Sequence, residues 1–159
     1  MAKSKRSLLQ KEIGQTKPFR NLSQEAVIAI VRAADVLKRR FNIVEEYGVT
    51  HQQYNVLRIL RGARPEALPT MEIARRMIEA APGITGLLDR LEEKGLVVRA
   101  RDGDDRRCSR CTITAKGLDL LKELDGPVNR AEEEAVAMLS RADLGRLVEI
   151  LDAVSKQDD

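Results

Sequence analysis

The segment from Arg101 to Arg107 has the strongest potential for chemistry, because it places three arginines and three aspartates within seven residues. Guanidinium groups bind phosphate, and they also enter narrow A·T-rich minor grooves of DNA, where the negative potential is strongest. Arg106 and Arg107 stand near the expected tip of this polar loop and are candidates for such contacts. Asp102 and Asp105 are expected to hold the turn and its arginines in shape, because carboxylates at the base of a loop accept backbone N–H bonds.

Two cysteines, Cys108 and Cys111, follow this loop in C-x-x-C spacing. The spacing suggests a zinc site or a redox pair. However, two ligands do not make a zinc site, and the single histidine, His51, is far away in the sequence. Strand positions i and i+3 point to opposite faces, so a disulfide between the two cysteines is not expected. We predict that they fill strand positions as small apolar residues, without a metal or cofactor.

The residues around the loop predict the elements that would present it. Ahead of it, apolar residues at helical spacing predict a short amphipathic helix; they are Ile84, Leu87, Leu88 and Leu91. Gly95 is expected to end this helix, because glycine adopts a left-handed cap at low cost. Leu96 to Val98 suit a first strand, Thr112-Ile113 closes a second, and Thr114 can cap the next helix. A helix followed by a hairpin with a basic tip is what a winged helix-turn-helix needs to touch DNA twice.

The segment from Ile84 to Gly117 resembles the winged-helix motif of the MarR family of bacterial transcription regulators. The family pattern reads roughly V-T-x-L-V-D-R-L-E-x-K-G-L-V-x-R, then D-P-x-D-R-R, then L-T-x-K-G. This chain matches it at Ile84-Thr85, Leu87 to Glu92, Lys94 to Val97, Arg99, Asp102, Asp105, Arg106, Arg107, Thr114, Lys116 and Gly117. The resemblance implies a mainly α-helical fold with a small β-hairpin wing, in which N- and C-terminal dimerisation helices flank a winged helix-turn-helix core. It also implies a homodimeric transcription factor, commonly a repressor, that binds a pseudo-palindromic operator in double-stranded DNA.

Apolar stripes predict three helices ahead of this motif. Ser23 can cap a helix that runs to about residue 46, and the capping-box pattern from Thr50 to Gln53 begins a second helix. Thr70 can cap a third helix that runs to about residue 78.

Beyond the motif, the pattern predicts a helix over residues 114–140, with a kink ahead of Pro127, and a last helix over 141–156. Terminal helices with broad apolar faces are not stable in water, so we expect them to pair with the same helices of a second subunit. The expected parts are a basic N-terminal arm (1–20) and a single MarR-like domain (21–159), made of a winged helix-turn-helix core (50–113) and dimerisation helices (21–47 and 114–156).

Charge is unevenly distributed along the chain, although the net charge is only +3. Residues 1–116 carry 23 Lys/Arg against 14 Asp/Glu, or +9, and residues 117–159 carry 5 against 11, or −6. The basic part suits a polyanion such as DNA. No apolar run approaches the roughly 18 residues of a membrane span, and the basic N-terminus lacks the apolar core of a signal peptide. We expect a protein of the bacterial or archaeal cytosol, associated with the nucleoid.

The resemblance places the DNA contacts on the recognition helix and the wing. The expected positions are Thr70, Pro82, Gly83, Thr85, Gly86, Arg90, Arg106 and Arg107. The N-terminus of the recognition helix offers N–H groups to phosphate. Thr85 is expected to contact phosphate or a base edge, and Arg90 is expected to grip phosphate or to bridge to an aspartate of the wing.

Many relatives release DNA when a small aromatic compound enters a crevice between the dimer helices and the winged core. The candidates for such an effector pocket in this chain are Tyr47, His51, Tyr54 and Arg58. For His51 and Tyr54, ordinary roles in a first helical turn and in the core stay open. The sequence does not predict an enzyme, because it lacks a nucleophile–base pattern, a phosphate-binding glycine loop and a metal cluster. The alternatives are a redox-responsive regulator that uses Cys108 and Cys111, and an architectural DNA-binding protein without a ligand.

Overall fold

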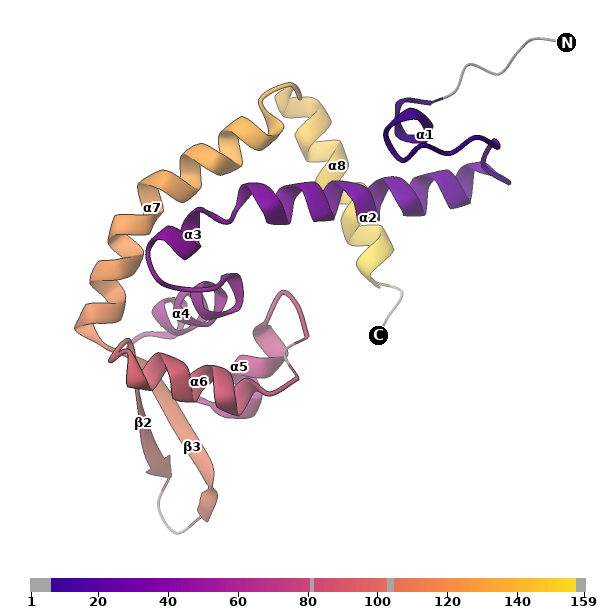
Figure 1. Cartoon of the computed structure of the whole chain (residues 1–159). Coiled ribbons are helices and arrows are strands. Elements are labelled where there is room, and N and C mark those ends of the chain that lie inside the picture. Colours follow the sequence, from indigo (N-terminus) through magenta and orange to yellow (C-terminus); the bar gives the residue numbers. More distant parts are fainter. Residues whose placement is uncertain (1–6, 81, 103–104, 157–159) are drawn as a thin grey trace, which may run out of the picture. The chain divides into compact units, whose positions relative to one another are not determined.

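The computed structural model describes residues 7–80, 82–102 and 105–156, and for residues 101, 102 and 105–108 it describes the backbone alone. The chain forms two compact units, Met1–Arg40 and Phe41–Asp159. The first unit holds α1 (Leu8–Glu12) and α2 (Leu22–Arg40), and the other helices and strands belong to the second (Figure 1). The break in packing thus follows α2, whereas the sequence led us to expect an arm that ends at residue 20. That arm stays a prediction.

The long helix predicted from Ser23 to about Glu46 is in fact two helices. Asn21 Oδ1 accepts the N–H of Gln24 at 2.9 Å, so Asn21, and not Ser23, provides the side-chain cap of α2. At its other end, α2 stops at Arg40, with three basic residues in its last turn, where exposed carbonyls favour cations. The separate helix α3 (Ile43–Glu46) follows. Apolar spacing alone did not reveal the intervening turn, because the stripe continues across it.

The second unit contains the predicted helix-turn-helix and hairpin. Its elements in order are α3, α4 (His51–Ala63), β1 (Leu68–Pro69), α5 (Thr70–Arg76), α6 (Ile84–Glu93), β2 (Val97–Asp102), β3 (Asp105–Ile113), α7 (Ala115–Val136) and α8 (Arg141–Ser155). The strands form an antiparallel sheet in the order β1-β3-β2, with Leu68 opposite Cys111 and Val97 opposite Ile113. The predicted mainly helical fold with a small β wing is confirmed.

The predicted capping box at the start of α4 is present. Thr50 Oγ1 accepts the N–H of Gln53 at 3.2 Å, and Gln53 Oε1 accepts the N–H of Thr50 at 3.2 Å. The expected cap of α5 was wrong, because Pro69 takes the cap position and Thr70 is the first helical residue. α5 also ends at Arg76, earlier than residue 78.

The polar loop predicted between Arg101 and Arg107 is largely strand. β2 continues through Asp102 and β3 begins at Asp105, with an irregularity in the pairing register between Arg101 and Asp102. Backbone pairing between adjacent strands does not require apolar side chains, so a hairpin can extend into charged sequence. The hairpin therefore projects further than the apolar pattern indicated.

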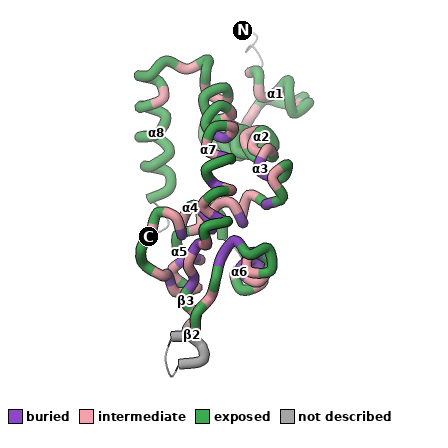
Figure 2. The backbone as a smooth tube through the Cα atoms, turned by 90° about the vertical axis from the view of Figure 1, so that its left-hand side faces the viewer, coloured by how far each residue is buried: buried purple, intermediate pink, exposed green. Residues whose placement is uncertain are grey.

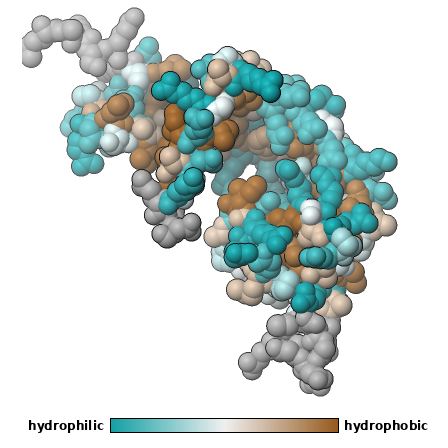
Figure 3. Space-filling model, turned by 180° about the vertical axis from the view of Figure 1, so that it is seen from behind, coloured by the Kyte–Doolittle hydropathy of each residue, from teal (hydrophilic) through white to brown (hydrophobic). Residues whose placement is uncertain are grey.

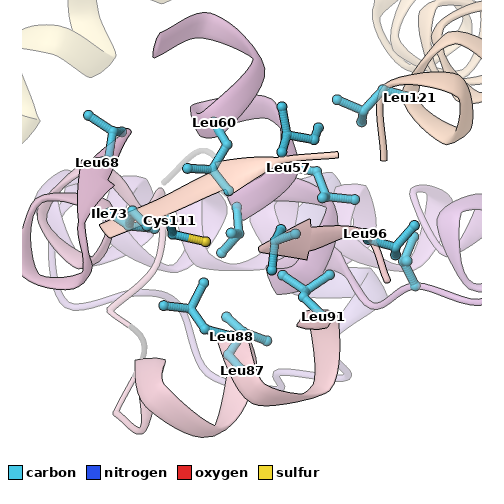
Figure 4. Close-up of a cluster of buried hydrophobic side chains, with 14 of the residues drawn as sticks. Leu57, Leu60, Leu68, Ile73, Leu87, Leu88, Leu91, Leu96, Cys111 and Leu121 are labelled. Carbon is cyan, nitrogen blue, oxygen red and sulfur yellow. The ribbon is translucent and has the colours of Figure 1, made fainter. Parts of the chain in front are cut away.

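Side chains from the helices and from the sheet meet in one core around α4 (Figure 4). The largest fully buried side chains are Leu57, Leu60, Ile73, Leu88, Leu91, Leu121, Leu124, Val44, Val56 and Cys111. Burial of apolar surface contributes about 25 cal/mol per Å2 to stability, so burial in this core is the main term that holds α5 and α6 against α4.

α7 begins at this core, and α8 follows it in the chain. Thr114 caps α7 as predicted, since its Oγ1 accepts the N–H of Gly117 at 3.1 Å. α7 continues through Pro127 as one helix and ends at Val136, before the predicted residue 140 (Figure 1). α8 has no buried residue over its whole length (Figure 2). None of the helices that the structure describes is long and apolar enough to cross a membrane.

Candidate nucleic-acid interface

α6 has one buried face and one exposed face. Its apolar residues Leu87, Leu88 and Leu91 point into the core (Figure 4), while Thr85 and Arg90 are exposed. The helix begins after Gly83, whose φ of 91° lies in the left-handed region, and no side chain caps this end. Its first N–H groups can therefore serve an anion such as phosphate. Pro82 and Gly83 are exposed beside this end, where the sequence placed them.

Gly86 leaves open space on the same face of α6. A Cβ atom built there would meet only the Arg90 guanidinium, at 4.0 Å from its Nη2 atom. The glycine is thus not required by close packing. The position has room for a side chain, although this chain carries none.

Three charged side chains, Asp89, Glu92 and Arg99, join α6 to β2; we call this cluster the α6–β2 clasp. Glu92 Oε2 accepts hydrogen bonds from Arg99 Nε at 2.9 Å and from Arg99 Nη2 at 2.7 Å, and Glu92 Oε1 accepts the backbone N–H of Arg99 at 3.0 Å. Arg99 Nη2 also donates to Asp89 Oδ1 at 2.5 Å. The Arg99 side chain is only 23% exposed, which makes its ion pairs less open to water than most on the surface.

The clasp shifts the pKa values of Glu92 and Arg99. Hydrogen bonds from the side chain and then from the backbone of Arg99 hold the pKa of Glu92 below its usual range. The Glu92 carboxylate in turn raises the pKa of Arg99, with a smaller contribution from Asp89. Glu92 and Arg99 are therefore both charged at neutral pH, and their hydrogen bonds are intact there.

Sequence reasoning missed the clasp. It considered Arg90 as a residue that grips phosphate or bridges to an aspartate of the wing; the side chains of those aspartates lie outside the described ones, so that role stays a prediction. The signal that could have revealed the clasp is the pair of acids at i and i+3 on one face of α6, followed by an arginine in the next strand. Which strand residue faces that pair depends on tertiary packing.

The inner strand of the wing has a second attachment. Thr70 Oγ1 donates to the backbone oxygen of Ser109 at 3.3 Å, and Arg110 Nη1 donates to the backbone oxygen of Ala67 at 3.2 Å. Thr70 was predicted to contact DNA. In the structure it is half-buried, and its hydroxyl is hydrogen-bonded to β3. Thr70 therefore has an evident role in holding the wing.

The β2–β3 hairpin projects from the helices of the second unit (Figure 1). The backbones of Asp102, Asp105, Arg106 and Arg107 belong to its strands. Their side chains lie outside what the structure describes, so the contacts expected for the two arginines and the stabilising role expected for the two aspartates stay predictions.

Cys111 is fully buried in the core and is a free thiol. Burial raises its pKa to about 11, against a smaller opposing influence from Arg99. A thiol is nucleophilic as its thiolate, so Cys111 is poorly suited to redox sensing and is instead the small apolar core residue that we predicted. The side chain of Cys108 lies outside the described ones. The described residues contain no group of three or more His, Cys, Asp or Glu that could hold a metal ion.

The candidate effector residues follow one side of α4. His51, Tyr54 and Arg58 are three and four positions apart, and the Arg58 guanidinium lies 5.8 Å from the centroid of the Tyr54 ring. Burial raises the pKa of Tyr54. His51 Nε2 is buried and has no hydrogen-bond partner among the described residues. Tyr47 is half-buried at the end of α3 and packs with Tyr54 against the core.

An exposed recognition helix, a projecting hairpin and the clasp between them define a winged-helix protein. The MarR family model matches residues 47–107. The HTH-type transcriptional regulator MhqR of Bacillus subtilis is 30% identical over 112 residues, which cover 70% of this chain and 75% of the relative. The homoprotocatechuate degradative operon repressor of Escherichia coli is 27% identical over 126 residues, covering 79% and 84%. The crystal structure of a MarR transcription factor from Planctomyces limnophilus is 37% identical, with a TM-score of 0.67, covering 86% of this chain and 99% of that one. The chain belongs to the MarR family of winged-helix transcriptional regulators.

Proposed function

We propose that this protein is a transcriptional repressor that binds a pseudo-palindromic operator as a homodimer and is released by a small aromatic effector. The observation that carries the proposal is the α6–β2 clasp. It joins the exposed face of α6 to the first strand of the wing, so that two DNA probes are held in one fixed relation. The Escherichia coli relative, a repressor of a degradative operon, supports repression over activation.

DNA recognition in this proposal uses both probes. The uncapped N-terminus of α6 and the exposed Thr85 and Arg90 enter a major groove, while Arg106 and Arg107 on the wing reach the adjacent minor groove. Gly83, which has no side chain, allows the backbone at this end to approach phosphate closely, and Pro82 stands exposed beside it.

Dimerisation is supported by apolar side chains that α2 and α8 leave exposed. On α2 they are Val27 (60% exposed), Ile30 (38%) and Val31 (63%), and on α8 they are Leu147 (39%), Val148 (58%), Ile150 (50%), Leu151 (38%) and Val154 (51%). Apolar atoms accordingly reach the surface of the molecule in several places (Figure 3). Several large apolar side chains left exposed on one helix are typical of association sites. A second copy of the chain is the occupant that the family's architecture favours.

Effector binding is supported by the side of α4 that carries His51, Tyr54 and Arg58. An aromatic ring can stack on Tyr54, and an acidic or phenolic oxygen can accept hydrogen bonds from Arg58 and His51 Nε2. A thermal-shift screen of aromatic acids and phenols, followed by release of bound operator, tests this part. A compound that stabilises the protein and leaves the DNA bound is not its effector.

Selection of bound sequences from random duplexes tests the central proposal. The expected result is a motif of two inverted half-sites about one helical turn apart. Light scattering on the free protein and on the selected complex should show two chains in each. A monomer, or a selected pool with no common motif, contradicts the proposal.

A further inference from the structure

Polar side chains tie α4 to the C-terminal end of α6. Lys94, which follows the last residue of α6, donates from Nζ to the backbone oxygen of Gly48 at 2.7 Å and to Gln53 Oε1 at 3.0 Å. Gln53 is only 2% exposed, and the same Oε1 atom accepts the N–H of Thr50 in the capping box of α4. The ammonium group therefore joins the end of α6 to the start of α4 through a buried amide.

A second polar contact holds the segment of the chain that precedes α6. Asn55, one turn or less beyond Gln53 on α4, accepts the backbone N–H of Ile78 on its Oδ1 atom at 3.0 Å. Ile78 stands in the segment between α5 and α6, ahead of the first residue of the recognition helix. One helix thus holds the chain both before and after α6.

These hydrogen bonds fix the orientation of α6, which the apolar core alone does not fix. Leu88 and Leu91 fix α6 by apolar burial, which is strong but non-directional, so it resists separation better than rotation or sliding. Hydrogen bonds have narrow limits of distance and angle. The anchor at the C-terminal end of α6 and the one at Ile78, six residues ahead of its first residue, therefore limit which residues of α6 face outward.

We infer that Lys94 and Asn55 are positioning residues for DNA recognition: through them α4 sets the orientation of α6, although neither side chain contacts the DNA. This inference rests on the proposed DNA-binding function. The N-terminus of α6, at Gly83, is proposed to bind phosphate, and Lys94 lies at the opposite end of the helix. The Lys94 ammonium group already donates to two oxygen atoms.

The test for Lys94 is a salt series on the selected duplex with the full-length protein. Lys94→Met keeps the length of the side chain and removes the ammonium, and Lys122→Met, at an exposed position of α7, is the control for the same loss of charge. Loss of the charged hydrogen bonds is expected to weaken binding by about tenfold, with the slope of log affinity against log salt unchanged. Lys122→Met should bind as the wild type does.

Asn55 provides an independent pair of variants. Asn55→Ala removes the acceptor of the Ile78 N–H and should weaken binding, whereas Asn55→Asp keeps an acceptor oxygen and should restore most of it. Circular dichroism and thermal melts establish that each variant is folded at the assay temperature. If Lys94→Met is not folded, the comparison of the two Asn55 variants decides.

Three results would overturn the inference. The salt slope of Lys94→Met could fall by about 0.9, which would mean direct contact with a phosphate. Lys94→Met and Asn55→Ala could bind with wild-type affinity while the wild type binds its duplex tightly. Asn55→Asp could bind as weakly as Asn55→Ala. By contrast, a wild-type protein without any preferred duplex refutes the proposed function itself, so the two failures are distinguishable.

Discussion

Glu92 and Arg99 meet through three hydrogen bonds, two from the guanidinium and one from the backbone N–H of the arginine, at 2.7 to 3.0 Å. Glu92 lies in the last turn of the recognition helix, and Arg99 lies in the first strand of the wing. Because a carboxylate that accepts both kinds of donor constrains distance and angle together, the pair fixes the orientation of α6 relative to β2.

Breaking this pair should destabilise the protein by a measurable amount. Arg99→Met leaves Glu92 and Asp89 without their partner, and we expect the free energy of unfolding to fall by about 1–2 kcal/mol in urea titrations. Arg90→Met, on the helix that carries Asp89 and Glu92, is the matched control, since within the described residues Arg90 has no ion pair; it should change stability by less than about 0.5 kcal/mol. A double-mutant cycle with Glu92→Gln should give a coupling energy clearly above zero. Additive effects of the two substitutions would show that the hydrogen bonds contribute nothing.

The pair should also make stability depend on pH in the acid range. Arg99 lowers the pKa of Glu92 in the folded state from its ordinary value of 4.5, so the folded protein binds fewer protons than the unfolded one there. The resulting stabilisation is fully present above that ordinary value and is lost as the pH falls through the lower folded value. Unfolding curves from about pH 6 to about pH 3 should thus show the difference between wild type and Glu92→Gln becoming smaller. A difference that is constant over the whole range would argue against the shifted pKa.

Gly117 is expected to be intolerant of any side chain. A Cβ atom there would lie 2.4 Å from the backbone oxygen of Leu96 and 2.7 Å from Ile113 Cγ1, at the junction of α7 with the sheet. Gly117→Ala should therefore cost about 1–3 kcal/mol in thermal or urea unfolding. Gly62→Ala in α4 is the control, because a Cβ atom there would meet nothing within 4 Å; it should stabilise by up to about 1 kcal/mol. Equal effects of the two substitutions would contradict the packing argument.

Two glycines at the start of α6 should respond in opposite ways. Gly83 has a φ of 91°, which an alanine adopts only with strain, so Gly83→Ala should destabilise by about 1–2 kcal/mol. Gly86 is helical with open space, so Gly86→Ala should stabilise by up to about 1 kcal/mol. Chemical unfolding of both variants beside the wild type measures the contrast. A stabilising Gly83→Ala substitution would mean that the helix does not start at this residue.

Cys111 should resist thiol reagents in the native protein. In a Cys108→Ser variant, Cys111 is the remaining thiol, and with a pKa of about 11 and full burial it should react at neutral pH far more slowly than after unfolding. The reaction rate of the native and the denatured variant with an aromatic disulfide measures this ratio. Peroxide treatment of that variant should leave DNA binding intact. Rapid native labelling, or loss of binding on oxidation, would revive the redox alternative.

Local signals account for the parts of the fold that the sequence predicted well. The apolar spacing of α6, the glycine after it, and the caps at Thr50 and Thr114 act over four residues or fewer, and all are present in the structure. The turn between α2 and α3 was missed because the apolar stripe runs across it. The strand positions of Arg101 and Asp102 were missed because pairing with β3, and not side-chain type, decides them.

The candidate site was predictable only in part. The exposed face of α6 follows from helical periodicity, so Thr85 and Arg90 could be assigned from the sequence. Arg99, Lys94 and Asn55 contact residues that lie between 7 and 46 positions away in the chain. Such pairings depend on how the helices and strands pack, so a single sequence does not predict which partner a charged side chain contacts.

The open space above Gly86 bears on how copies of such a protein diverge after gene duplication. A Cβ atom added at this position meets only the tip of the Arg90 side chain, and the substitution gains helix propensity instead of losing it. In the proposed mode of DNA binding, a single codon change here would alter the operators that a descendant prefers while the fold is kept, and no compensating substitution has to come first.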